Sequence, residues 1–217
     1  RPEGGWRESS LGRAAVRHGP LVLALFALVL FFQVWTGRVL TAENLLNILN
    51  QVQVNAILAF AMTFPIIIGG IDLSVGSVHG MTGRLAAGLL AVSFPEAAAL
   101  PIAVAAGAAF GLANGLVVSL PRVAPFIVTL GTMSIARGIA YIIARGSDLG
   151  VPRGASMLEA VGRARPAGIP VPVLIMAVLF AVLWVVLHRT RFGQHAYAIG
   201  GNREAARLVG IAIRPVE

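Results

Sequence analysis

Long apolar stretches alternate with short polar segments along this chain. A membrane-spanning helix needs about 17 to 25 mainly apolar residues to cross roughly 30 Å of hydrocarbon, and six stretches meet that length. We therefore predict an all-α fold, a polytopic transmembrane helical bundle of about six helices within residues 20–187. The predicted spans are Pro20–Gly37, Val52–Gly70, Leu73–Phe94, Ala97–Leu120, Val123–Ala144 and Ile169–Leu187.

The composition supports a membrane protein and removes several other classes of protein. Of the 217 residues, 57% are hydrophobic and 12% are charged, and the mean hydropathy is +0.84. The formal net charge of +8 accompanies long apolar runs, so we do not expect nucleic-acid binding. All 17 basic residues are Arg, and without Lys the chain has no P-loop for ATP. Without Cys it has no thiolate nucleophile, disulfide or Cys-ligated metal.

The arginines predict the orientation, because cytoplasmic loops of membrane proteins carry an excess of positive charge. With the N-terminus inside, ten arginines fall on the inner side, five on the outer side and two within spans. Segments 1–19 and 188–217 are then cytoplasmic, and the loop near 145–168 lies outside. The chain opens at Arg1 without Met and stops at Glu217 after a polar segment, so we expect a fragment of a longer protein.

The segment Gly69–Ser77, GGIDLSVGS, places polar residues between the second and third predicted spans. Pro65 and the Gly69-Gly70 pair favour a broken helix, whose freed backbone groups are tolerated at membrane depth only beside protein or a water-filled cavity. Asp72 is interpreted either as a helix cap or structural partner, or as a direct contact to a solute. Ser74 is a second candidate in the same segment.

Polar and charged side chains also occur inside predicted spans. Arg84 and Arg137 must reach water, line a polar path, or pair with carbonyls or an acid such as Asp72. Uncharged polar residues in spans are usually explained by interhelical hydrogen bonds, and contact with a translocation path is the alternative. The uncharged candidates are Asn55, Asn114 and Thr129.

Small residues repeat along the fourth predicted span. Gly107, Gly111 and Gly115 follow one another at four-residue spacing, which lines one face of a helix. Such a row lets a neighbouring helix approach closely. We therefore predict that these three glycines pack against another helix.

The polar segment after the sixth span predicts a short cytoplasmic helix. Asn202 is a suitable N-cap, residues 203–209 suit two helical turns, and Gly210 suits the C-terminal stop. Its arginines allow it to lie on anionic lipid, and docking to a soluble partner is the alternative.

No catalytic or metal-binding arrangement is evident. The four histidines lack metal-ligand spacing, and HExxH and GxSxG motifs are absent from the sequence. We therefore predict neither catalytic residues nor a metal site, and an enzyme acting within the membrane has no support.

Three segments together resemble a known family. They are GGIDLSVGS at 69–77, PFIVTLGTMSIARG at 125–138 and RFGQHAYAIGGNREAARLVGI at 191–211. In order and position they resemble the permease subunits of bacterial ABC importers for monosaccharides, the ribose, xylose, arabinose and galactose group. The resemblance covers about residues 44–213. A quorum-signal importer of the same family is an alternative.

The resemblance implies a transport subunit that is not itself an enzyme. Its expected partners are two ABC ATPase subunits, a second permease subunit in a homodimer or close pair, an extracytoplasmic sugar-binding protein and membrane lipid. No cofactor is expected in this chain, since the partner ATPase alone would bind Mg-ATP. The expected location is the bacterial inner membrane. Such permeases have about ten helices, so the remaining ones would follow Glu217.

The resemblance also assigns the short cytoplasmic helix. Glu204, Ala205 and Ala206, followed by Gly210, match the loop through which many ABC importer permeases contact their ATPase, with Asn202 preceding them. Arg137 lies in the matching SIARG segment, whereas Arg84 departs from the small or apolar residues usual in the family.

A transporter of another class is the main alternative to the importer. In a secondary transporter driven by an ion gradient, Asp72 and Arg137 would form a gating or proton-coupled pair. Unwound glycine segments are the places where such proteins bind solutes.

Overall fold

The computed structural model describes residues 10–120, 123–145 and 156–213, and within these ranges its regular elements are all helices. The chain divides into two units, residues 1–51 and 52–217. Four pieces of predicted segments lie outside the described residues: 1–9 of the N-terminal segment, 121–122 of the transmembrane domain, 146–155 of the outer loop and 214–217 of the docking loop.

The first unit contains α2 (Ser10–Thr36) and the beginning of α3 (Ala42–Ile67). Gly37, at φ +68°, ends α2 in a conformation that favours glycine. The turn is then held by side chains: Gln33 Oε1 accepts the N–H of Leu40 at 2.8 Å, and Asn44 Nδ2 donates to the carbonyl of Val39 at 2.9 Å. Two polar side chains therefore replace the backbone hydrogen bonds lost between the helices.

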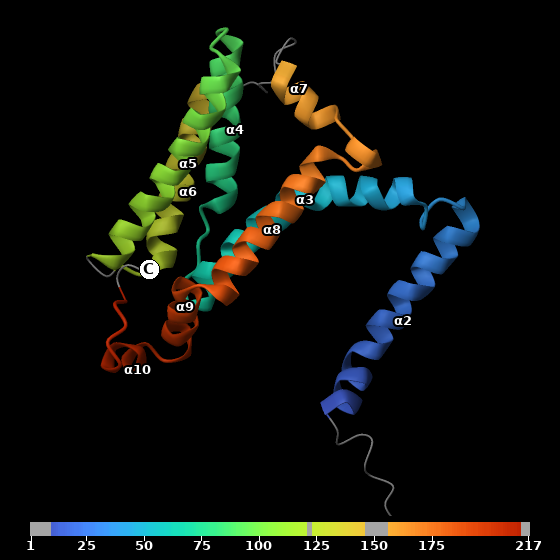
Figure 1. The fold of residues 1–217 in the computed structure, drawn as a ribbon, viewed down its shortest axis with the longest axis horizontal. Coiled ribbons are helices and arrows are strands. Elements are labelled where there is room, and N and C mark those ends of the chain that lie inside the picture. Colours follow the sequence, from blue (N-terminus) through green and yellow to red (C-terminus); the bar gives the residue numbers. More distant parts are fainter. Residues whose placement is uncertain (1–9, 121–122, 146–155, 214–217) are drawn as a thin grey trace, which may run out of the picture. The chain divides into compact units, whose positions relative to one another are not determined.

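Three helices pack side by side in the second unit: α4 (Val75–Ala91), α5 (Glu96–Ser119) and α6 (Pro125–Ala144) (Figure 1). Their shared core contains Met81 from α4 together with Ala136 and Ala140 from α6. Phe110 of α5 packs against this cluster. Small side chains on α6 thus allow it to lie close to α4.

A short helix, α7 (Ser156–Arg163), is attached at the N-terminal end of α5. The Glu96 carboxylate accepts the N–H groups of Met157 and Leu158 at 2.8 and 3.2 Å. Leu158 packs against Leu90 and Ala99. Glu96 therefore satisfies two orphan N–H groups in the first turn of α7 and links α5 to it.

The remaining elements follow a 3₁₀ turn at Pro166–Gly168. They are α8 (Val171–Arg189), α9 (Arg191–Gly201) and α10 (Arg203–Leu208). Thr190 ends α8 and caps α9, since its hydroxyl accepts the N–H of Gly193. The chain thus changes direction twice within a few residues after the last long helix.

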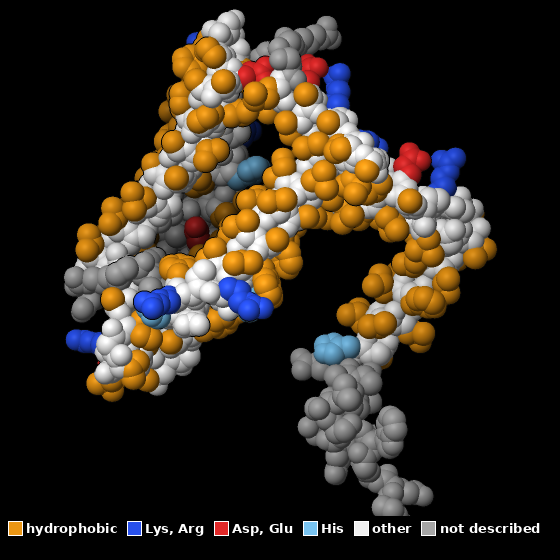
Figure 2. All heavy atoms as spheres, in the orientation of Figure 1, with side chains coloured by type: hydrophobic (Ala, Val, Ile, Leu, Met, Phe, Trp, Pro, Cys, Tyr) orange, Lys and Arg blue, Asp and Glu red, His pale blue; other side chains and the backbone are white. Residues whose placement is uncertain are grey.

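The prediction of an all-α membrane bundle is confirmed, because five described helices have the length and composition to cross a membrane. They are His18–Thr36 within α2, Ala42–Ile67, Glu96–Ser119, Pro125–Ala144 and Val171–Arg189. Their large apolar side chains are widely exposed, and Figure 2 shows hydrophobic side chains along the visible surface of α2, α3 and α8. In a membrane these surfaces meet lipid or other helices.

The third predicted span, Leu73–Phe94, is shorter than expected. α4 has 17 residues, about 25 Å of helix, which falls short of roughly 30 Å of hydrocarbon. Its N-terminus begins at Val75 because the preceding segment stays non-helical, and it ends before Ser93, which has a positive φ of 62°. Conversely, α3 starts at Ala42, ten residues before the predicted Val52.

Candidate functional site

The segment between α3 and α4 is irregular from Ile68 to Ser74. Gly69 takes a φ of +82°, and Gly69 and Gly70 donate their N–H groups back to the carbonyls of Ile66 and Pro65 at 3.1 and 2.8 Å. These bonds close the last turn of α3 and release the following chain from the helix. The structure therefore shows the break that Pro65 and the glycine pair predict.

A chain of polar side chains fastens this segment to α5 and α6. The hydroxyl and N–H of Ser74 donate to Asp72 Oδ1 at 2.6 and 2.8 Å. Asn114 Nδ2 donates to Ser74 Oγ at 3.1 Å, and Thr132 Oγ1 donates to Asn114 Oδ1 at 2.5 Å. Ser74 is 1% exposed and Asn114 is 8% exposed. Such bonds are strong in a low-dielectric interior, so the network holds the irregular backbone in one position.

Thr129 makes a second attachment from α6. Its hydroxyl accepts the N–H of Leu73 at 3.2 Å and lies 3.2 Å from the carbonyl oxygen of Ile71, to which it donates. The buried side chain of Thr129 thus provides hydrogen-bond partners for two backbone groups that lie outside any helix or strand.

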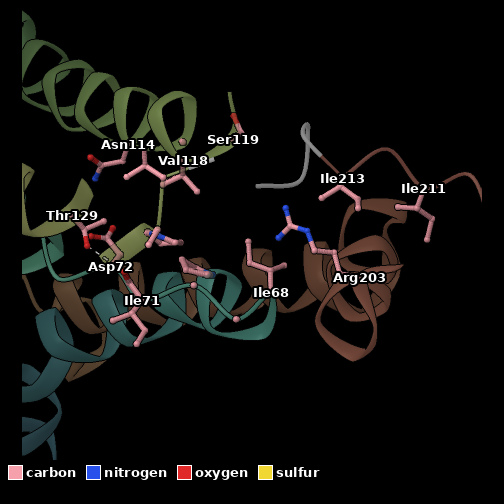
Figure 3. A pocket seen from close by; sticks show the side chains of 18 of the residues that line it. Ile68, Ile71, Asp72, Asn114, Val118, Ser119, Thr129, Arg203, Ile211 and Ile213 are labelled. Carbon is pink, nitrogen blue, oxygen red and sulfur yellow. Dashed lines mark hydrogen bonds between the residues drawn. The ribbon is translucent and has the colours of Figure 1, made fainter. Parts of the chain in front are cut away.

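A cavity of about 880 Å³ lies beside the irregular segment. Figure 3 shows Asp72, Asn114 and Thr129 at one end, with Arg203, Ile211 and Ile213 at the other. The cavity is therefore polar where the network lies, and the polar segment after the last long helix borders its far end. Hydroxyl, amide and carboxylate groups suit a neutral polyol by type.

The segment after α9 forms a short capped helix. Asn202 Oδ1 accepts the N–H of Ala205 at 3.0 Å, and Ile211 N donates to the carbonyl of Ala206 at 3.0 Å. Gly210, which follows the C-terminal end of α10, has a φ of +84°. This geometry is a capped α10 with a left-handed glycine at its end, which gives a short, stiff protrusion.

The two sides of α10 differ. Ala206 is buried, whereas Leu208 and Val209 are 86% and 76% exposed. Glu204 is exposed and borders the cavity. The exposed apolar end of α10 is the part available to another protein.

The sequence comparisons identify the class of protein that carries this arrangement. Residues 44–217 match the family described as branched-chain amino acid transport system / permease component. The chain belongs to this permease family. It is therefore a multi-pass membrane protein, and its resemblance to sugar import permeases is confirmed.

Several curated relatives of the permease are sugar importers by name. It is 41% identical to the ribose import permease protein of Bacillus subtilis over 92% of the chain, and 39% identical to that of Escherichia coli over 90%. The galactose/methyl galactoside import permease protein of Escherichia coli is 38% identical over 89% of the chain. The chain spans about 62% of the length of these relatives. No solved structure matches it.

The predicted polar residues of the permease do not all contact one another in the structure. Arg137 Nε donates to Ser77 Oγ at 3.2 Å, and among the described residues it forms no ion pair with Asp72. The gating pair required by the gradient-driven alternative is thus not formed. Asn55 is exposed on α3 and lies outside the described network and the cavity wall.

The glycine row of α5 is divided between two roles. A Cβ on Gly107 would lie 3.3 Å from Thr82 Cγ2, which is the close helix approach expected. A Cβ on Gly111 would meet no described atom within 4 Å, so packing against another helix stays a prediction there. Gly111 and Gly115 instead line the cavity.

Several contacts in the structure of the permease could not be predicted from the sequence. Thr132 and Ser77 form hydrogen bonds with the predicted site residues Asn114 and Arg137. Neither Thr132 nor Ser77 lies in a sequence pattern that indicates this contact. The helix α9 was also not predicted, although Thr190 before Arg191 is a usable N-cap signal. Within the described ranges, no three His, Asp or Glu side chains gather in a way that would hold a metal ion.

Proposed function

We propose that the chain forms part of the transmembrane permease subunit of an ATP-binding-cassette importer, carrying a monosaccharide delivered by an extracytoplasmic binding protein. The importer would lie in the bacterial inner membrane with both described ends of this chain in the cytoplasm. Separate ATPase subunits would bind Mg-ATP, and a second permease subunit would complete the path. The names of the relatives support the solute class.

The geometry of α10 carries this proposal. Asn202 and Gly210 fix a short helix at both ends, and the exposed Leu208 and Val209 extend from it. A rigid protrusion of this kind suits a cleft on an ATPase, where nucleotide-driven closure is converted into movement of the membrane helices.

The cavity supports a role in solute passage. It joins the polar network of the irregular segment to α10, so that solute and ATPase would act on neighbouring parts of one unit. Asp72, Asn114 and Thr129 supply hydrogen-bonding groups at its polar end.

The test is purification of the full-length tagged protein from its native membrane in mild detergent, with mass spectrometry of the chains that accompany it. An ATPase with a P-loop is expected. Gly210→Leu should remove that ATPase, because φ +84° is strained for a side chain. Leu208→Glu tests the same surface without backbone strain, since Leu208 is exposed and its loss leaves no cavity.

Gly162→Leu on α7 is the matched control, because a Cβ at Gly162 meets no described atom within 4 Å. It should retain the ATPase. If no ATPase accompanies the wild type after gentle crosslinking, or if both α10 variants keep it, the proposal fails. Uptake that survives ATP depletion and collapses with an uncoupler would then identify a gradient-driven transporter.

A further inference from the structure

The open side of α4, which carries the exposed residues Gly76, His79 and Gly83, differs from the surface of every other long helix. Large apolar side chains are exposed on α2, α3, α5, α6 and α8, but none is exposed between Val75 and Ala91. A helix surface that faces lipid is apolar, since hydrocarbon offers no partner for polar groups. The open side of α4 is therefore unsuited to lipid and suited to a polar path.

Glycines hollow out this open side. Gly76 and Gly83 border space in which an added Cβ would meet no described atom within 4 Å. At Gly80 an added Cβ would meet one described atom within 4 Å, Arg84 Nη1 at 3.6 Å. His79 is exposed beside them. A solute can thus approach the backbone of α4 directly along this side.

Arg84 lies over the hollow with no partner among the described residues. It is half-buried near the middle of α4, and it forms no hydrogen bond or ion pair within the described ranges. A guanidinium at membrane depth is costly unless an anion, carbonyls or water compensate it. The position of Arg84 therefore calls for a compensating group in the open space.

A second guanidinium borders the same side. Arg137 of α6 is exposed, and its Nε donates to Ser77 Oγ at 3.2 Å. Ser77, Gly80 and Arg84 are spaced by three and four residues, so they share one side of α4. Neither α4 nor α6 contains an acidic residue. Asp72 and Glu96 are equally near to Arg84 along the chain, and they bond to Ser74 and to the first turn of α7 respectively.

We propose that the open side of α4 is a solute subsite in which Arg84 and Arg137 bind the carboxylate of an acidic monosaccharide, such as a hexuronate. Guanidinium groups match carboxylates through charge and paired N–H donors. Ser77, His79 and the backbone exposed by the glycines would meet the sugar hydroxyls. The inference rests on the proposed permease function, and it departs from ribose, galactose and fructose, the sugars in the relatives' names, which carry no carboxylate.

The experiment compares acids with their neutral parents in cells that express the complete importer and lack other routes of entry. The radiolabelled probes are galacturonate and galactose, glucuronate and glucose, and ribonate and ribose. We expect the wild type to take up at least one acid in preference to its parent. Arg84→Ala should raise the KM for that acid about tenfold or more, and Arg84→Lys should restore part of the loss.

Arg38→Ala removes an exposed arginine from the loop before α3 and is the control for charge alone. It should leave the KM unchanged. Uptake of none of the acids by the wild type, or an acid KM that Arg84→Ala alters by less than twofold, overturns the inference. An acidic side chain elsewhere in the importer would then neutralise Arg84 and Arg137. ATPase co-purification does not depend on the solute, so the permease function survives that outcome and fails only in its own test.

Discussion

The Cα of Gly200, in α9, lies against the main-chain carbonyl oxygen of Ile67, the last residue of α3. A Cβ at residue 200 would overlap that oxygen. The rings of Phe64 and Phe192 make a second contact between α3 and α9, with centroids 5.9 Å apart. The helix that precedes α10 is therefore seated on the end of α3, immediately before the irregular segment that contains Asp72.

This contact places α9 between the proposed ATPase-docking helix and the polar segment of the cavity. Gly193 makes the same kind of approach to the carbonyl of Leu187 in α8. Because backbone groups touch at both points without a flexible side chain between them, a movement of α9 has to displace the ends of α3 and α8 as well. In the proposed importer, α9 is the mechanical link between α10 and the membrane helices.

Replacement of Gly200 by Ala should destabilise the permease. The added methyl group overlaps the carbonyl of Ile67, and overpacking of this kind costs about 1–3 kcal/mol. Thermal unfolding of the full-length protein in detergent measures the effect. Gly201→Ala is the matched control, since a Cβ there meets no described atom within 4 Å, and it should unfold near the wild-type temperature. Equal stability of the two variants would contradict the close approach.

Replacement of Asn114 by Leu should loosen the irregular segment. The change removes the bonds to Ser74 and Thr132, and interhelical hydrogen bonds in membranes are worth about 0.6–2 kcal/mol. Hydrogen exchange of residues 68–74 should become faster, and the free energy of unfolding should fall by about that amount. Asn55→Leu is the control, because Asn55 is exposed outside the network. Unchanged exchange in the Asn114 variant would show that the network does not restrain the segment.

Replacement of Glu96 by Ala should release the first turn of α7. The carboxylate holds the N–H groups of Met157 and Leu158, and loss of such a cap typically costs about 1 kcal/mol. Hydrogen exchange in residues 157–163 should rise, while Glu96→Gln keeps an acceptor and should have a smaller effect. Glu43→Ala, in the first turn of α3, is the control at another helix start. Slow exchange that persists in the Glu96→Ala variant would place the anchor of α7 elsewhere.

The sequence alone determined the features that depend on neighbouring residues. The presence of long membrane helices follows from continuous apolar residues, and Pro65 with the Gly69-Gly70 pair ends α3 through local backbone geometry. Asn202 and Gly210 define α10 in the same way, since a cap needs only the adjacent turn. The family resemblance also rests on short ordered motifs, and the comparison with known permeases confirms it.

Only the tertiary structure decided which distant residues meet. Asn114 bonds to Ser74, 40 residues away in the sequence, and Arg137 bonds to Ser77, 60 residues away. These pairs meet because the packing of α4 against α5 and α6 sets the relative height and rotation of the three helices. Periodicity placed Gly111 on a helix face, but the space beside it depends on where α4 begins. Local sequence defines a helix and its ends. Which side chains share a hydrogen bond, and which side of α4 stays open, follow from the joint packing of several helices and from no single segment.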